Sequence, residues 1–232
     1  MKRRAPSDLL RLAESLVRFG KANGAEEVEV GIGDGREFDV DVRQGQIENL
    51  VEAGSRSAGI KIIRDQKTAF ASSSDFSAET LHRLIKNAIL RAELSSRDEF
   101  AGLPSPSSIK IAPQSLDLFD PEVARLDSQA KVRLALETER IALGDKRITN
   151  SHGASFSTTE AKSVLANSNG FSGEYDKTYC SLGVGLQAGD TDHLVEDFWF
   201  SSEAHLGSLE TPEEIARTAV ERTVRQLNPR KI

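Results

Sequence analysis

The order in which hydrophobic periodicities follow one another most constrains the fold of this chain. A 3.6-residue pattern over residues 7–22 predicts an amphipathic helix. Several runs that alternate at every second residue follow it, and then Ser77 precedes an apolar stripe that keeps the helical period from Leu81 to Ala92. This succession predicts a unit of helix, antiparallel strands and helix.

The strands of this first unit are expected to pair as hairpins. Residues 28–32 and 38–42 alternate apolar and polar side chains on either side of Asp34-Gly35. Because Asp-Gly favours a type I′ turn, we predict a hairpin that reverses at these two residues. Further strands are expected over residues 47–55, 58–64 and 68–73, with a turn at Asp65-Gln66.

The same order returns in the C-terminal half. Asp127 is expected to cap a helix that ends at Gly144, and Thr211 begins the last helix in a capping box with Glu214. The strands between these helices are expected over residues 147–158, 160–167, 171–187 and 193–202. The predicted fold class is therefore α+β, with two units of helix, antiparallel β-sheet and helix.

Proline and serine mark the division between the two units. Four of the seven prolines lie within residues 96–121, where serines are interleaved with them. Because proline fixes φ and lacks a backbone donor, neither a continuous helix nor a central strand fits this stretch. We predict an N-terminal α+β unit over 1–95, a Pro/Ser-rich linker or crossing segment over 96–121, and a second α+β unit over 122–232.

Composition limits the classes of function. The net charge of -6 has the wrong sign for general attraction to phosphate backbones, so nucleic acid is not an expected partner. No apolar run approaches the roughly 18 residues of a membrane span, and no apolar core follows the basic first four residues as in a signal peptide. The single cysteine cannot form an internal disulfide, which fits a reducing compartment. We expect a soluble, cytoplasmic protein without a membrane partner.

Two ligand classes have little support in the sequence. The four histidines are far apart and no His-Glu-x-x-His motif occurs, so no metal site is expected from this chain. Residues 183–188 match a relaxed dinucleotide-binding fingerprint, but a further strand follows them where that fingerprint needs a helix. We therefore interpret Gly183 and Gly185 as sites of close packing or a bulge.

Cys180 and several serines are the candidate nucleophiles. Cys180 shares its parity in an alternating run with Leu182 and Val184, which predicts a buried structural thiol. Residues 72–74 are serines that precede Asp75 and a helix cap, which is typical of a solvated turn. A self-contained hydrolase that uses Cys180 or a serine stays open as an alternative.

An alternation of acidic and aromatic residues late in the second unit forms a candidate contact surface. Asp197, Trp199 and Ser201 share one side of the expected strand. A tryptophan flanked by polar groups is typical of interface centres, and the alternative is that Trp199 belongs to the core. We predict that the three residues form an interface or a peptide contact.

Short segments along nearly the whole chain carry a family resemblance. In the first unit they are Gly59-Ile60-Lys61-Ile62, Ala69-Phe70-Ala71-Ser72-Ser73-Ser74-Asp75-Phe76-Ser77 and Gly102-Leu103-Pro104. In the second they are Arg147-Ile148-Thr149-Asn150-Ser151, Gly153-Ala154-Ser155, Asn167-Ser168-Asn169-Gly170-Phe171, Asp197-Phe198-Trp199-Phe200-Ser201 and Arg230-Lys231-Ile232. In this order they resemble the PmbA/TldD family, historically called modulator of DNA gyrase, and more closely its PmbA (TldE) branch.

The resemblance implies a cytoplasmic complex that processes peptides by proteolysis. Members of the family are longer, and the TldD branch carries a His-Glu-x-x-x-His zinc motif that this sequence lacks, so no catalytic or metal-binding residue is carried over. The chain would be the non-catalytic N-terminal portion of a PmbA (TldE)-like subunit of a metalloprotease complex, with a scaffolding or substrate-positioning role. Its expected partners are a TldD-type subunit or a second copy, and a peptide substrate. No cofactor is expected in this chain, because zinc belongs to the TldD-type partner.

A third reading stays open beside the protease subunit and the hydrolase. It is a stand-alone acidic module that recognises an extended peptide by strand addition at a sheet edge.

Limited proteolysis tests the predicted division of the chain. We expect a protease of broad specificity to cut first within residues 96–121, because a stretch without regular secondary structure fits a protease active site more readily than a helix or strand does. Mass spectrometry should identify products that correspond to residues 1–95 and 122–232. Protection of the stretch, with first cleavage inside residues 77–94, would show that the boundary is misplaced.

Overall fold

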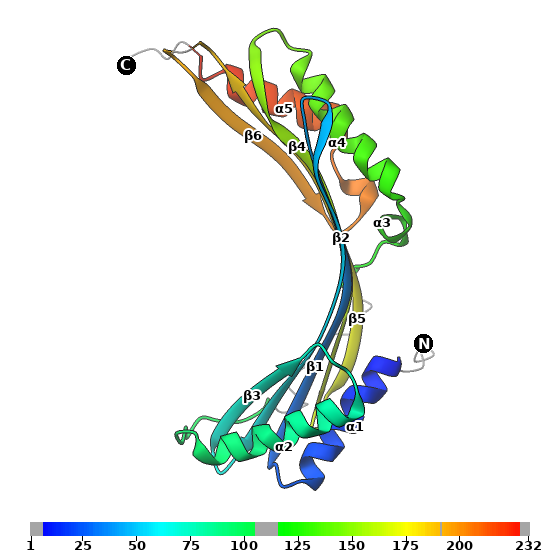
Figure 1. Cartoon of the computed structure of the whole chain (residues 1–232), viewed down its shortest axis with the longest axis vertical. Coiled ribbons are helices and arrows are strands. Elements are labelled where there is room, and N and C mark those ends of the chain that lie inside the picture. The colour runs from blue at the N-terminus through cyan, green and yellow to red at the C-terminus, as the bar shows by residue number, and fades with distance from the viewer. Residues whose placement is uncertain (1–6, 105–115, 191, 228–232) are drawn as a thin grey trace. The chain divides into compact units, whose positions relative to one another are not determined.

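The computed structural model describes residues 7–104, 116–190 and 192–227, and it confirms the α+β class (Figure 1). The helices are α1 (Asp8–Ala22), α2 (Ala78–Leu94), α3 (Pro121–Arg125), α4 (Ser128–Leu143) and α5 (Pro212–Val224), with a 3-10 helix, η3, at Leu206–Ser208. The strands are β1 (Glu27–Arg43), β2 (Gln46–Arg64), β3 (Lys67–Ser73), β4 (Ile148–Asn167), β5 (Ser172–Ala188) and β6 (Val195–Glu203). None of the helices in these ranges has the length and apolar character needed to cross a membrane.

The long helices begin where the sequence places their caps. A backbone N–H in the first turn of each donates a hydrogen bond to the capping side chain, which belongs to Ser7, Ser77, Asp127 or Thr211. The Glu214 carboxylate completes the capping box by accepting from the Thr211 backbone N–H at 2.9 Å. Because a cap depends on residues only two or three positions apart, these helix starts are predictable from local sequence.

The predicted hairpin at Asp34-Gly35 is wrong. β1 continues through these residues to Arg43, and the chain reverses at Gln44-Gly45, where φ is 50° and 71°. Asp34 stays extended beside β2, and its carboxylate accepts a hydrogen bond from Arg56 at 2.9 Å. Pairing along the whole strand therefore outweighs the local turn preference of Asp-Gly.

Two further expected breaks also fall inside continuous strands. Residues 47–55 and 58–64 belong to the single strand β2. The strands expected over 147–158 and 160–167 form the single strand β4, which begins at Ile148. The turn at Asp65-Gln66 is confirmed, with φ of 53° and 59°, and β3 pairs antiparallel with β2 after it. The six strands form an antiparallel sheet in the order β3-β2-β1-β4-β5-β6.

Contacts group the chain into two compact units that are discontinuous in sequence. Unit 1 comprises Met1–Gly35, Gly54–Asp117 and Ala161–Asp176, and unit 2 comprises Arg36–Ala53, Leu118–Glu160 and Lys177–Ile232. The reason is that β1, β2, β4 and β5 each contribute residues to both units. The division at residues 95 and 121 stays a prediction, and residues 105–115 of the expected linker lie outside the described residues.

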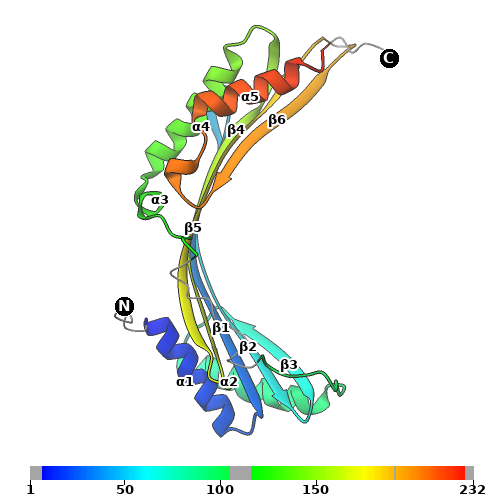
Figure 2. The same ribbon diagram turned by 180° about the vertical axis from the view of Figure 1, so that it is seen from behind.

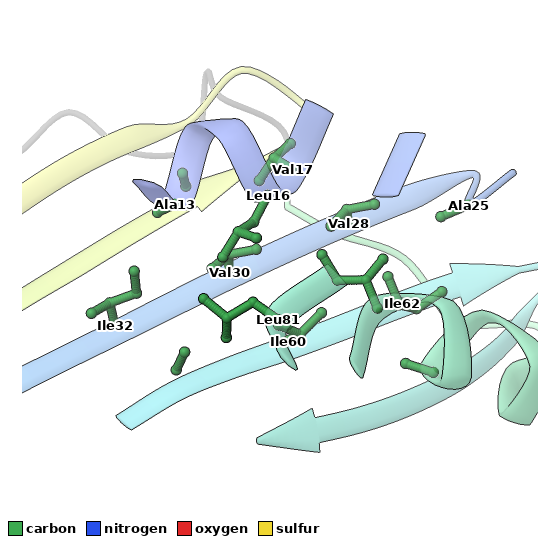
Figure 3. Packing of buried hydrophobic residues seen from close by; sticks show 14 of the residues in the cluster. Ala13, Leu16, Val17, Ala25, Val28, Val30, Ile32, Ile60, Ile62 and Leu81 are labelled. Carbon is green, nitrogen blue, oxygen red and sulfur yellow. The ribbon is translucent and has the colours of Figure 1, made fainter. Parts of the chain in front are cut away.

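In unit 1, α1 and α2 cover one face of the strands (Figure 1). Figure 3 shows the buried side chains that fill this core, among them Ala13, Leu16, Val28, Val30, Ile60, Ile62 and Leu81. At Gly20, α1 approaches β1 so closely that an added Cβ would lie 2.8 Å from Cγ2 of Val28. A larger residue there would push the helix away from the sheet.

In unit 2, α4 and α5 pack on one face of the strands, as the reverse view in Figure 2 shows. Its largest fully buried side chains are Phe156, Leu182, Leu186 and Ile215. No helix in the described part of the chain covers the opposite face of this unit (Figures 1 and 2). This uncovered face is the surface on which the candidate site lies.

A buried carboxylate on α4 fixes the tip of the β1–β2 hairpin in unit 2. Glu139 is 1% exposed, and its two carboxylate oxygens accept hydrogen bonds from the backbone N–H groups of Gln44 at 3.0 Å and Gly45 at 2.9 Å. Both turn residues have positive φ, so their N–H groups point away from the carbonyl groups of the neighbouring strands. Glu139 therefore couples the position of the hairpin to the helix layer.

Replacing this carboxylate should destabilise unit 2. We expect Glu139→Ala to lower the free energy of unfolding by about 2 to 3 kcal/mol, because two backbone donors lose a charged acceptor. Urea unfolding followed by circular dichroism measures the change. Glu137→Ala is the matched control on the same helix, since its side chain pairs only at the surface with Arg140, and we expect no measurable change there. Equal effects of the two substitutions would contradict the anchoring role.

Candidate functional site

A groove of about 600 Å³ lies on the helix-free face of unit 2. The alternation of side chains along β6 explains its position on this face. The Trp199 ring lies beside α5, so its neighbours Phe198 and Phe200 point to the opposite, helix-free face. The groove crosses five strands, with these residues among its lining: Glu48 of β2, Asp41 of β1, His152 and Ser155 of β4, Gly183 and Gly185 of β5, and Phe198 and Phe200 of β6.

Gly183 and Gly185 form the floor of the groove. An added Cβ at Gly183 would lie 2.9 Å from Cβ of Phe200, and one at Gly185 would lie 3.2 Å from Cβ of His152. Across the two strands, Gly183 pairs with Phe200 and Gly185 with Phe198. The prediction that these glycines mark close packing is confirmed, and β5 continues past them to Ala188.

Phe198 and Phe200 form an aromatic wall at one end of the groove. Their side chains are 59% and 53% exposed, and their stacked rings have centroids 6.1 Å apart. Covering exposed aromatic area with another apolar group removes it from water, which is favourable. This end of the groove therefore suits a large aliphatic or aromatic side chain.

Asp41 and Glu48 make the opposite end of the groove acidic. Both residues are exposed. The Asp41 carboxylate accepts a hydrogen bond from the Asn49 amide at 3.2 Å, and it forms no ion pair within the described residues. The Arg43 guanidinium lies 3.9 Å from Glu48, a separation at which an exposed pair contributes little. A cationic group of a ligand could therefore approach both carboxylates.

Polar side chains that fix one another lie between and beside these two ends. His152 Nε2 is 3.3 Å from a Glu196 carboxylate oxygen, which also accepts a hydrogen bond from the Gln187 amide at 2.7 Å. The hydroxyls of Ser181 and Ser202 are 2.8 Å apart. Because each of these groups has a partner within the chain, the middle of the groove is lined by polar side chains that are held in place.

The predicted contact residues Asp197, Trp199 and Ser201 lie on the helix-facing side of β6. Arg222 of α5 pairs with Asp197 at 3.2 Å, and its guanidinium lies 5.3 Å from the centroid of the Trp199 ring. Ser201 is buried. Their role as an interface or peptide contact stays a prediction, and the largely exposed aromatic side chains of this strand are on its other face.

Sequence reasoning did not single out Phe198 and Phe200, although they alternate with Trp199. The one available signal was the glycine pair of the preceding strand, because a phenylalanine opposite a glycine leaves room on that face. The carboxylates of Asp41 and Glu48 gave no signal, since they lie more than a hundred residues earlier in the chain. Strand order, which alternation does not reveal, brings the two ends into one groove.

Cys180 is buried, as its parity predicts. Burial raises the pKa of its thiol to about 11, and the charges of Asp120 and Glu203 add to the shift. A nucleophilic cysteine needs the opposite environment. Among the serines, Ser73 exchanges hydrogen bonds with the Asp75 backbone, which fits the predicted turn. Within the described ranges, no three His, Cys, Asp or Glu side chains are grouped so that they could hold a metal ion.

Alkylation kinetics test the environment of Cys180. With a pKa of about 11, only about 0.1% of the thiol is ionised at pH 8, so iodoacetamide should react about a hundredfold more slowly with the native chain than with the urea-unfolded chain. The native rate should keep rising between pH 8 and 10, where that of an ordinary thiol levels off. Cys180→Ala supplies the unreactive control. A native rate that matches the unfolded one and levels off near pH 9 would reveal an accessible, reactive thiol.

Two family models match the chain. The PmbA/TldA metallopeptidase domain 1 matches residues 28–92, and the PmbA/TldA metallopeptidase central domain matches residues 121–227. Together they span more than half of the sequence.

Similar proteins carry related names. Metalloprotease PmbA of Escherichia coli O157:H7 is 30% identical over 214 residues, which are 92% of this chain and 46% of that protein. A metalloprotease PmbA homolog of Haemophilus influenzae is 29% identical over 213 residues, or 91% of this chain and 46% of the relative. The chain thus spans about half the length of these relatives.

Solved structures repeat the fold. A crystal structure from Bacteroides thetaiotaomicron, named for a modulator of DNA gyrase, superposes with a TM-score of 0.88 at 25% identity, covering 97% of this chain and 52% of the other. TldE from Thermococcus kodakarensis gives a TM-score of 0.80 at 20% identity, covering 92% and 47%, a likeness that shows the fold alone. From the family models and the relatives together, the chain belongs to the PmbA/TldD family.

Proposed function

We propose that this chain is the non-catalytic N-terminal portion of a PmbA (TldE)-like subunit and that it holds an extended peptide for a metalloprotease assembly. In that assembly the zinc would be carried by a TldD-type subunit, because this sequence has no His-Glu-x-x-x-His motif. The names of the relatives support the peptidase context. The chain spans about half the length of those relatives. Its part in peptide cleavage, its TldD-type partner and a cytoplasmic location are therefore parts of this proposal.

The groove on the open face of unit 2 is the observation that carries this role. It crosses five strands and joins an aromatic wall to an acidic end. Its volume of about 600 Å³ is that of a small-ligand or short-peptide site, and its floor has no side chain that would block an extended backbone. A positioning surface needs this kind of shape and does not need a nucleophile or a metal.

Peptide binding with and without the aromatic wall tests the role. We expect fluorescein-labelled peptides from reduced, denatured casein to bind the 232-residue chain in fluorescence anisotropy. The double variant Phe198→Ser/Phe200→Ser should weaken binding about tenfold or more, because the apolar contact is lost. Phe70→Ser is the matched control, since Phe70 is 64% exposed on β3 in unit 1 and lies outside the groove.

Hydrolysis by a TldD-type subunit gives the second readout. Adding the native chain should accelerate cleavage of the same peptides, and adding the double variant should not. Peptide binding that survives loss of both phenylalanines, or hydrolysis by the chain alone, would contradict the proposed function.

The exposed edge of β2 favours a second candidate, the stand-alone module that binds peptides by strand addition. Pairing with β3 begins only at Ala58, and residues 46–57 precede it. Ile47, Leu50 and Val51 are 50%, 46% and 40% exposed in this segment. Charged side chains at such an edge block backbone pairing with another chain. If peptides bind by strand addition, Leu50→Lys/Val51→Lys should abolish binding, and Phe198→Ser/Phe200→Ser should retain it.

A further inference from the structure

The two ends of the groove are separated by a distance that the strand order fixes. The aromatic wall lies on β6 and Asp41 on β1, and β5 and β4 lie between them. Neighbouring strands are about 4.8 Å apart, so the three spacings from β6 to β1 amount to roughly 14 Å. Glu48 on β2 adds one further spacing.

An extended peptide laid across the strands can match this separation. It advances about 3.3 Å per residue and directs alternate side chains to the same side. Residues four positions apart therefore lie roughly 13 Å apart and both face the sheet. The residue midway between them faces the glycine floor, where Gly183 and Gly185 present no side chain of their own. The selection therefore depends on the two ends of the groove.

The charge of the groove selects the sign of the second anchor. The lining includes the carboxylates of Asp41 and Glu48 and contains no lysine or arginine. On the same strand, burial raises the pKa of Asp39, and the nearby charges of Glu37 and Asp41 raise it further. The carboxylates of β1 thus repel one another, and a cation from outside the chain would relieve that repulsion.

Building on the proposed function, we infer that the groove selects extended peptides in which an aromatic or large aliphatic side chain lies four residues from a lysine or arginine. The large apolar side chain covers Phe198 and Phe200. The basic side chain reaches Asp41 and Glu48. The occupant is therefore a basic, apolar peptide segment bound across the strands, and a sheet edge takes no part.

A set of synthetic peptides tests the inference on the 232-residue chain. The reference peptide carries Phe, Ala and Lys at every second position, with Ser between and beside them. In one partner peptide Glu replaces Lys, and in another the Lys is moved one position closer to the Phe so that it points away from the sheet. We expect each partner to bind about tenfold more weakly than the reference in fluorescence anisotropy at low salt.

Charge variants of the chain locate the effect. In Asp41→Asn/Glu48→Gln the preference for Lys over Glu should fall to less than about twofold, because the attracting carboxylates are gone. Glu37→Gln/Glu52→Gln is the matched control. It removes the same charge from the same two strands at exposed positions outside the groove lining, and it should keep the preference.

The outcomes separate the inference from the proposed function. If every peptide binds equally and all binding depends on Phe198 and Phe200, peptide holding stands and the selection rule is overturned. A Lys preference that ignores spacing, or that survives in Asp41→Asn/Glu48→Gln, also overturns the rule. If no peptide binds, both the selection rule and the proposed function are overturned. Both are also overturned if the chain forms a concentration-dependent dimer that peptides do not dissociate and that Phe198→Ser/Phe200→Ser abolishes.

Discussion

Continuous antiparallel pairing of four long strands is the constraint on which the rest of this structure depends. β1, β2, β4 and β5 each contribute residues to both compact units. Each strand keeps its backbone donors and acceptors satisfied by its neighbours, so a sequence with a strong turn preference such as Asp34-Gly35 stays extended inside β1. The two hydrophobic cores form on this framework, and β1 and β4 contribute buried residues to both of them.

The placement of helices on one face then decides where a site can form. In unit 2, α4 and α5 bury one face of the sheet, and Glu139 ties the β1–β2 turn to α4 through two hydrogen bonds. The other face keeps its side chains in solvent, and alternation brings Phe198 and Phe200 out there together with the glycines of β5. A groove with a bare floor and an aromatic wall is the direct consequence of this one-sided layer.

The groove has an aromatic end and an acidic end. The thiol of Cys180 faces the core, and its pKa is raised. It is therefore not on the open face, where a ligand meets the apolar and acidic surfaces. A peptide can contact both surfaces at once, because three strand spacings (roughly 14 Å) nearly equal the rise of an extended chain over four residues (roughly 13 Å). This geometry links the proposed scaffold role in a peptidase assembly to the proposed preference in peptide sequence.

The sequence by itself determined the α+β class, the helix starts at Ser77 and Thr211 and the burial of Cys180, because caps and alternation depend on residues a few positions apart. It did not determine where long strands end, since the turn at Gln44-Gly45 gains its stability from pairing partners and from a helix far along the chain. Nor did it determine which face of β6 is open. Alternation separates the side chains of a strand into two sets, and only the tertiary structure, by packing α5 against one set, decided which set meets the solvent.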